Sequence, residues 1–137
     1  MRLIVCGGRN YGKPLEGDGE GRGVKSDDEA KHERAFLVIT MRRLLDRGLV
    51  GMAHGGASGA DTLAALWCTE VGVDATAYPV DHDLDGPWPS AGPCRNARML
   101  AAEFPRVAGV LAFRGGQGTR DMCQRAYDAG LKIWAPA

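Results

Sequence analysis

The chain has 137 residues, 45% of them hydrophobic, and its 17 Lys and Arg residues balance 17 Asp and Glu residues. This length fits a single domain, residues 1–137, with a proper core, and argues against a multi-domain protein. The balanced charge disfavours nucleic acid as the main partner, because proteins that grip its backbone carry a basic excess. The four scattered cysteines form no zinc-like cluster, so we expect reduced thiols and no metal site. We also expect no cofactor.

No run of about 18 apolar residues occurs, so no segment has the length and apolarity of a membrane-spanning helix. The apolar start, Met1 to Cys6, is too short for a signal peptide. We therefore expect a cytoplasmic protein without a membrane partner.

The first third of the chain predicts a strand, a loop and a helix. Residues 3–6 are an apolar run that predicts the first strand. The polar, glycine-rich residues 14–28 can bury almost nothing and predict a flexible insertion. From about Asp27 to Gly48 the pattern is helical, and we expect its apolar stripe to contain Phe36, Leu37, Ile39, Thr40, Leu44 and Leu45.

The rest of the chain alternates short apolar runs with amphipathic segments. Residues 49–53 and 74–79 predict strands, and residues 58–71 predict a helix between them with Leu63, Leu66 and Trp67 facing inward. The next stretch, 81–93, contains three prolines and two glycines, so we expect a loop with no regular element. The remaining elements are predicted as helix 93–104, strand 107–113, helix 119–129 and strand 131–134.

Alternation of strands and helices is typical of βαβ units and a parallel sheet. We expect an α/β fold, a three-layer doubly wound Rossmann-like domain with a mainly parallel sheet of about five strands. In such folds the ligand crevice lies at the carboxyl ends of the strands. Three glycine-bearing turns follow predicted strands and should converge there: Gly7-Gly8-Arg9, His54 to Gly59 and Gly115 to Thr119.

Glycines lack a Cβ atom and let backbone N–H groups approach an anion, and the N-terminus of a helix adds donors and a positive dipole end. We expect Thr119 at the N-cap of the last helix. The same glycines also suit any tight turn, and Ser58-Gly59-Ala60-Asp61 matches a capping box that only stabilises a helix start. Three such turns together favour a phosphate site, although neither a Walker P-loop nor a G-x-G-x-x-G fingerprint occurs.

Four ordered motifs carry a resemblance that spans nearly the whole chain: VCGGRNY at 5–11, HGGASGAD at 54–61, AGPCRNARML at 91–100 and FRGGQGTRDM at 113–122. In these motifs the chain resembles the YspA/YpsA-related branch of the SLOG superfamily, whose Rossmann-like members include the LOG phosphoribohydrolases. The resemblance implies a nucleotide or nucleotide-derived ligand. The expected ligand-binding residues are Gly7, Gly8, Arg9, Gly55, Gly56, Ser58, Gly59, Asp61, Arg95, Asn96, Gly115, Gly116, Gln117, Gly118 and Thr119.

Catalysis is the point at which the chain departs from the LOG enzymes. Their P-G-G-x-G-T-x-x-E motif ends in a glutamate that handles the ribose, and here that position is Met122, while Arg114 replaces the proline. Arg95 matches the arginine of the LOG R-K-x-x-M motif, and its alternative role is a solvated helix arginine. The resemblance therefore leaves Arg95 and Asp121 as the candidate catalytic residues.

Three further candidates keep two interpretations each. Asp61 either bonds a ribose hydroxyl or caps its own helix. The loop aromatics Tyr11 and Trp88 either stack on a base or anchor their loops. We interpret His54 as a structural histidine at the end of a buried strand.

Two functions from different classes follow. The first is a binding module that senses, carries or sequesters a nucleotide-like molecule, which Met122 favours. The second is a hydrolase that cleaves the N-glycosidic bond of a nucleoside monophosphate, with Arg95 and either Asp121 or Asp61 as polar groups. The balanced charge disfavours DNA binding, and related LOG proteins usually pair through helices, so we expect a homodimer.

Overall fold

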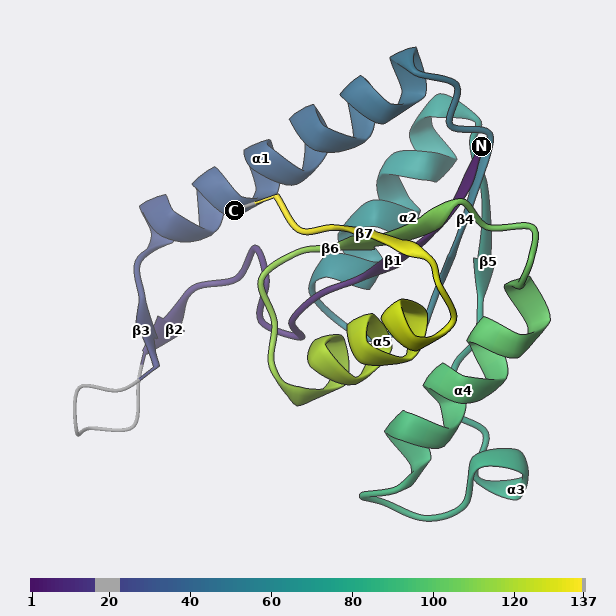
Figure 1. Ribbon diagram of the computed structural model, residues 1–137. Helices are drawn as coiled ribbons and strands as arrows, with labels where there is room; N and C mark the ends of the chain where they lie inside the picture. The colour runs from purple at the N-terminus through teal and green to yellow at the C-terminus, as the bar shows by residue number, and fades with distance from the viewer. Residues whose placement is uncertain (17–22, 137) are drawn as a thin grey trace.

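A parallel sheet of five strands forms the centre of the computed structural model, which describes residues 1–16 and 23–136. The strand order is β5-β4-β1-β6-β7 (Figure 1). Ile4 in β1 pairs with Ala53 on one side and with Val110 on the other. The strands are β1 (Arg2–Cys6), β4 (Gly51–His54), β5 (Asp74–Ala77), β6 (Gly109–Ala112) and β7 (Lys132–Trp134).

Helices cover both faces of this sheet. Helices α1 (Asp27–Asp46) and α2 (Ala60–Val71) lie on one face, and α4 (Ala91–Glu103) and α5 (Gln117–Asp128) lie on the other (Figure 1). The architecture confirms the predicted α/β, three-layer, doubly wound Rossmann-like fold with a five-stranded parallel sheet.

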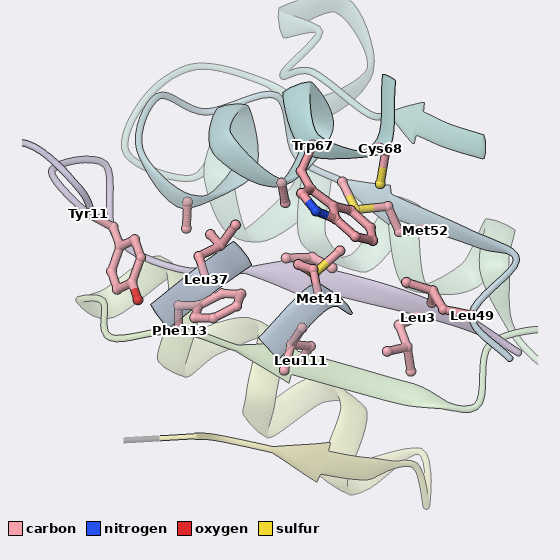
Figure 2. Close-up of a cluster of buried hydrophobic side chains, with 13 residues drawn as sticks. Leu3, Tyr11, Leu37, Met41, Leu49, Met52, Trp67, Cys68, Leu111 and Phe113 are labelled. Atoms are coloured by element: carbon pink, nitrogen blue, oxygen red, sulfur yellow. The ribbon is translucent and has the colours of Figure 1, made fainter. Parts of the chain in front are cut away.

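Strand β1 is buried on both faces because it lies in the middle of the sheet. Leu3 and Val5 pack against the layer of α1 and α2, whereas Ile4 and Cys6 pack against α4 and α5. The sequence of such a central parallel strand is therefore a continuous run of apolar residues. Figure 2 shows the cluster of buried side chains on the α1–α2 face, in which helix side chains such as Trp67 lie over the strands.

Two apolar helix residues predicted to face inward are exposed, and the prediction was wrong for both. Ile39 is 51% exposed and Leu66 is 58% exposed. The buried face of α1 contains Leu37 and Met41, and Ile39 is two positions from each, which is about 200° around a helix. Leu66 has the same relation to Ala64 and Cys68 on α2, which are both fully buried.

The stretch 81–93, predicted to hold no regular element, contains a short helix, α3 (His82–Asp85). The Asp81 side chain accepts a hydrogen bond from the Asp83 N–H at 3.0 Å and caps this turn. Asp85 is 4% exposed and receives hydrogen bonds from Nε and Nη2 of Arg98 on α4, at 3.0 and 2.8 Å. This buried ion pair holds α3 against α4, a long-range contact that the local sequence does not reveal.

Two short strands lie within the predicted insertion. Strand β2 (Leu15–Glu16) pairs antiparallel with β3 (Val24–Lys25). Lys25 ties this hairpin to α1, because its Nζ lies 2.6 Å from the Glu33 carboxylate. Residues 17–22, the centre of the predicted flexible segment, lie outside the described residues.

Candidate functional site

A cavity of about 800 Å³ opens at the carboxyl edge of the sheet, beside the end of β1. The chain winds outward from β1 in both directions, to β4 and β5 on one side and to β6 and β7 on the other. This switch point is where doubly wound sheets place their ligand crevice. The predicted site residues that line the cavity are Gly7, Gly8, Arg9, Gly55, Asp61, Arg95, Asn96, Gly116, Gln117, Gly118, Thr119 and Asp121.

The first turn of α5 presents open backbone donors to this cavity. Gly116 is the N-cap and α5 begins at Gln117, so the prediction of Thr119 as N-cap was wrong by three residues. No side chain caps this helix, and within the described residues the N–H groups of Gln117, Gly118 and Thr119 have no acceptor. A Cβ atom on Gly116 or Gly118 would meet no atom of the described residues within 4 Å. The helix start is therefore accessible to an anion.

The turn after β1 is joined to the turn after β6. The Gly8 N–H donates to the Arg114 carbonyl at 2.9 Å. A Cβ atom on Gly115 would lie 2.7 Å from the Gly8 nitrogen and would also overlap the Thr119 hydroxyl, so only glycine fits there. Gly115 does not line the cavity. It brings the two turns together. Gly8 lines the cavity, but its N–H is already bonded and is not free for a ligand.

The turn after β4 uses its own donors internally. Oδ2 of Asp61 accepts hydrogen bonds from the N–H groups of Gly55 and Ala57, at 3.0 and 3.2 Å. Nδ1 of His54 accepts from the Gly56 N–H at 3.0 Å. His54 is thus a satisfied structural residue, and burial followed by the Arg95 charge lowers its pKa.

Asp61 closes this turn in a different way from the expected capping box. The Ser58 hydroxyl donates to the Arg9 carbonyl at 3.1 Å, and α2 begins at Ala60 with no side-chain cap. Asp61 is 5% exposed and lines the cavity, and its burial raises its pKa to about 6 against the opposing effects of its backbone hydrogen bonds and Arg95.

The N-terminus of α2 is covered, in contrast to that of α5. The Ala60 N–H donates to the Gly8 carbonyl at 3.2 Å. Gly59 has a φ of +82°, and a Cβ atom there would overlap that same carbonyl oxygen. Gly56, Ser58 and Gly59 are not among the residues that line the cavity. Ser58 and Gly59 shape the contact between this turn and the turn after β1.

Arg95 lies at the wall of the cavity, held by backbone oxygens. Its Nη1 donates to the Gly55 carbonyl and, at 3.2 Å, to the Tyr78 carbonyl, and its Nε donates to Oδ1 of Asn96 at 3.1 Å. A Cβ atom on Gly55 would collide with the guanidinium. Within the described ranges, no carboxylate lies at ion-pair distance from Arg95, and burial lowers its pKa. Its charge is therefore available to an anion.

Asn96 connects α4 to the first turn of α5. It is 4% exposed, and its Nδ2 donates to the Gly118 carbonyl at 3.1 Å and to Oδ2 of Asp121 at 2.9 Å. Asp121 also receives a hydrogen bond from Arg125 at 2.9 Å. Asn96 thus positions both Arg95 and the start of α5, a role that the sequence did not indicate.

The residue at the family's glutamate position faces away from the cavity. Met122 is 1% exposed and packs in the core between the sheet and α5. Asp121, one residue earlier, lines the cavity. Any carboxylate that α5 offers to a ligand from this turn is therefore Asp121.

The two loop aromatics differ in position. Trp88 is 54% exposed and lines the cavity, with the guanidinium carbon of Arg9 5.6 Å from its ring centroid. Tyr11 is 5% exposed and packs on Phe113, with ring centroids 5.3 Å apart (Figure 2). Trp88 therefore borders the site, and Tyr11 anchors its loop.

Three arginine side chains contribute positive charge to the lining of this cavity. Arg9, Arg95 and Arg120 all line it. Across residues 1–16 and 23–136, no group of three or more His, Cys, Asp or Glu side chains is placed to hold a metal ion. None of the helices in these ranges is long and apolar enough to cross a membrane.

No protein-family model matches this chain, and no curated protein matches it either. Its structure is similar to the X-ray structure of TM1055, a target of the Northeast Structural Genomics Consortium. The similarity has a TM-score of 0.63 at 19% sequence identity, and it covers 97% of this chain and 72% of TM1055. At this identity the similarity shows the fold, a Rossmann-like three-layer α/β domain.

Proposed function

We propose that this protein binds a nucleotide or nucleotide-derived ligand, with a phosphate group at the first turn of α5. The observation that carries the proposal is the set of open N–H groups at Gln117, Gly118 and Thr119, which border a cavity also lined by Arg95. Helix N-termini favour anions through these donors and through the helix dipole. Arg95 adds a cation without a carboxylate partner among the described residues.

The remainder of the cavity suits a nucleoside. The exposed ring of Trp88 offers a surface for a base, and base–aromatic stacking contributes about 1 to 3 kcal/mol. The carboxyl group of Asp61 lines the same cavity and suits a ribose hydroxyl. These features support the resemblance to the YspA/YpsA-related branch of the SLOG superfamily and a role in sensing, carrying or sequestering the ligand.

Binding without turnover is the function we favour, because Met122 lies in the core where the LOG motif has its glutamate. One observation supports hydrolysis of an N-glycosidic bond as the second candidate. Asp61 has a pKa raised to about 6 and lines the cavity, and a carboxyl group that titrates near neutral pH suits general acid–base catalysis.

Calorimetric titration with the four common ribonucleoside monophosphates tests the proposal. We expect binding to wild type and weaker binding to Thr119→Val, which removes the hydroxyl beside the open donors. Thr69→Val is the matched control, because Thr69 is exposed on α2 and its hydroxyl donates to the Ala65 carbonyl of the same helix. Absence of binding by every monophosphate contradicts the proposal.

Chromatography of the same mixtures separates the two functions. Release of free base that disappears in Asp61→Asn or Asp121→Asn would favour the hydrolase, and intact nucleotide after prolonged incubation favours the binding module.

A cytoplasmic location and a homodimer remain predictions from the sequence. A single-subunit mass in solution scattering would contradict the homodimer.

A further inference from the structure

The cavity of about 800 Å³ described above is called the first hollow here. A second hollow of about 620 Å³ lies beside it, where α5 packs over the ends of β6 and β7. Its walls include Arg114, Tyr127 and Ile133. Thr119, Arg120 and Gln124 line both hollows. The two hollows therefore meet at the N-terminal part of α5, beside the open donors.

One face of α5 leads from this junction into the second hollow. Arg120, Gln124 and Tyr127 are spaced four and three residues apart, so they lie in one row along the helix. The distance along the axis from Arg120 to Tyr127 is roughly 10 Å, because each helical residue rises 1.5 Å. A ribose with its base, attached to a phosphate at the helix start, can span that length.

The chemistry of this row resembles that of the first hollow. Tyr127 is 71% exposed and offers a ring face to a planar group. Arg114 and Arg120 add two cations to the lining of the same hollow. The first hollow, at about 800 Å³, is already large enough for a mononucleotide. The second hollow thus provides room, charge and an aromatic ring for a further nucleoside.

We propose that the ligand is a dinucleotide, two nucleosides joined through a pyrophosphate, with one arm beside Trp88 and the other beside Tyr127. This inference rests on the proposed function, because the pyrophosphate occupies the donor site at the start of α5. Arg120 borders both hollows and is placed to contact either phosphate. The row from Arg120 to Tyr127 then distinguishes a dinucleotide from a nucleoside diphosphate of equal phosphate number.

The test compares three probes by calorimetric titration: the best-binding nucleoside monophosphate, its diphosphate, and the symmetric dinucleoside pyrophosphate of the same base. We expect the dinucleoside pyrophosphate to bind about 10-fold or more tightly than the diphosphate, because a second base is stacked. Tyr127→Ala should abolish this advantage, Tyr127→Phe should retain it, and both should bind the monophosphate like wild type. Leu66→Ala, at an exposed position of α2, is the remote control.

Two results separate failure of this inference from failure of the proposed function. If the monophosphate binds but the dinucleoside pyrophosphate has no advantage over the diphosphate, the proposed function stands and the dinucleotide inference is overturned. An advantage that persists in Tyr127→Ala overturns it equally. If none of the three probes binds, the proposed function and the inference fail together.

Discussion

Replacing Gln117 with proline removes one open donor at the start of α5 and leaves the helix intact. Gln117 is the first residue of the helix and is exposed. Proline is favoured at this position because its fixed φ suits the helix and the missing N–H has no partner there. The preceding residue, Gly116, has φ −102° and ψ −140°, outside the helical region that a following proline disfavours. We therefore expect Gln117→Pro to fold.

The expected loss of affinity follows from the hydrogen bond that the substitution removes. A hydrogen bond to a charged group contributes about 1.5 to 3 kcal/mol, so binding of a nucleoside monophosphate should weaken by about 10- to 100-fold. The matched control is Gln117→Ala, which keeps the N–H and should bind like wild type. Affinity is measured by calorimetric titration, and the free energy of unfolding by urea denaturation should be unchanged or about 0.5 kcal/mol higher in the proline variant.

Equal affinity of Gln117→Pro and Gln117→Ala would refute the assignment of this donor to a phosphate. Loss of affinity in both variants would instead assign the interaction to the glutamine side chain. Loss confined to the proline variant, with stability retained, identifies the backbone N–H as the binding group.

Three further predictions concern the surroundings of the site. Burial raises the pKa of Asp61 from 3.8 to about 6, so the folded state holds this proton more tightly than the unfolded state. As the pH rises from about 4 to about 6, the free energy of unfolding of wild type should fall relative to that of Asp61→Asn, by up to about 3 kcal/mol. A constant difference between the two free energies over this pH range, measured by urea denaturation, would contradict the prediction. Gly59→Ala should cost about 3 kcal/mol or more, because it forces a positive φ and overlaps the Gly8 carbonyl. In the control Gly72→Ala, where φ is +77° but nothing lies within 4 Å, the cost should be about 1 kcal/mol, and similar urea midpoints for the two variants would show that the overlap is relieved. Hydrogen bonding to Cys6 lowers the pKa of Cys123, so iodoacetamide labelling of Cys123, followed by mass spectrometry, should reach half its maximal rate at a lower pH than that of an ordinary thiol. Cys6→Ala should shift this profile to higher pH, and an unchanged profile would exclude the thiol pair as the cause.

The fold could be predicted because its signals are local. The apolar run at 3–6 predicted a buried central strand, and Leu3, Ile4 and Val5 are all fully buried. Helix boundaries were less accurate where a cap was inferred from residue type alone. Thr119 has the side chain of an N-cap, yet the contact of Gly115 with Gly8 turns the chain early, and α5 begins at Gln117. That contact joins residues more than 100 positions apart, so no local pattern could indicate it.

The sequence predicted where the candidate site lies in the fold. It could not predict which backbone N–H groups of the site are free to bind a ligand. Three glycine-bearing turns were expected to converge, and residues from all three line one cavity. Which turn retains free N–H groups depends on side chains that fold back onto the turn. Asp61 and His54 occupy the donors of the second turn, and the Arg114 carbonyl occupies that of Gly8.

This uneven distribution of donors explains why the glycines of the three turns have different roles. Gly59 and Gly115 allow backbones to approach so closely that any side chain would overlap a neighbouring turn, whereas Gly116 and Gly118 have open space where a side chain would be. The first two therefore serve packing, and packing alone gives no reason for the second two. A glycine that borders a cavity, with open space at its Cβ position, keeps the backbone N–H groups around it accessible, which a phosphate requires and a structural turn does not. The assignment of a ligand to α5 thus depends on two glycines, Gly116 and Gly118, whose missing side chains leave open space among the described residues.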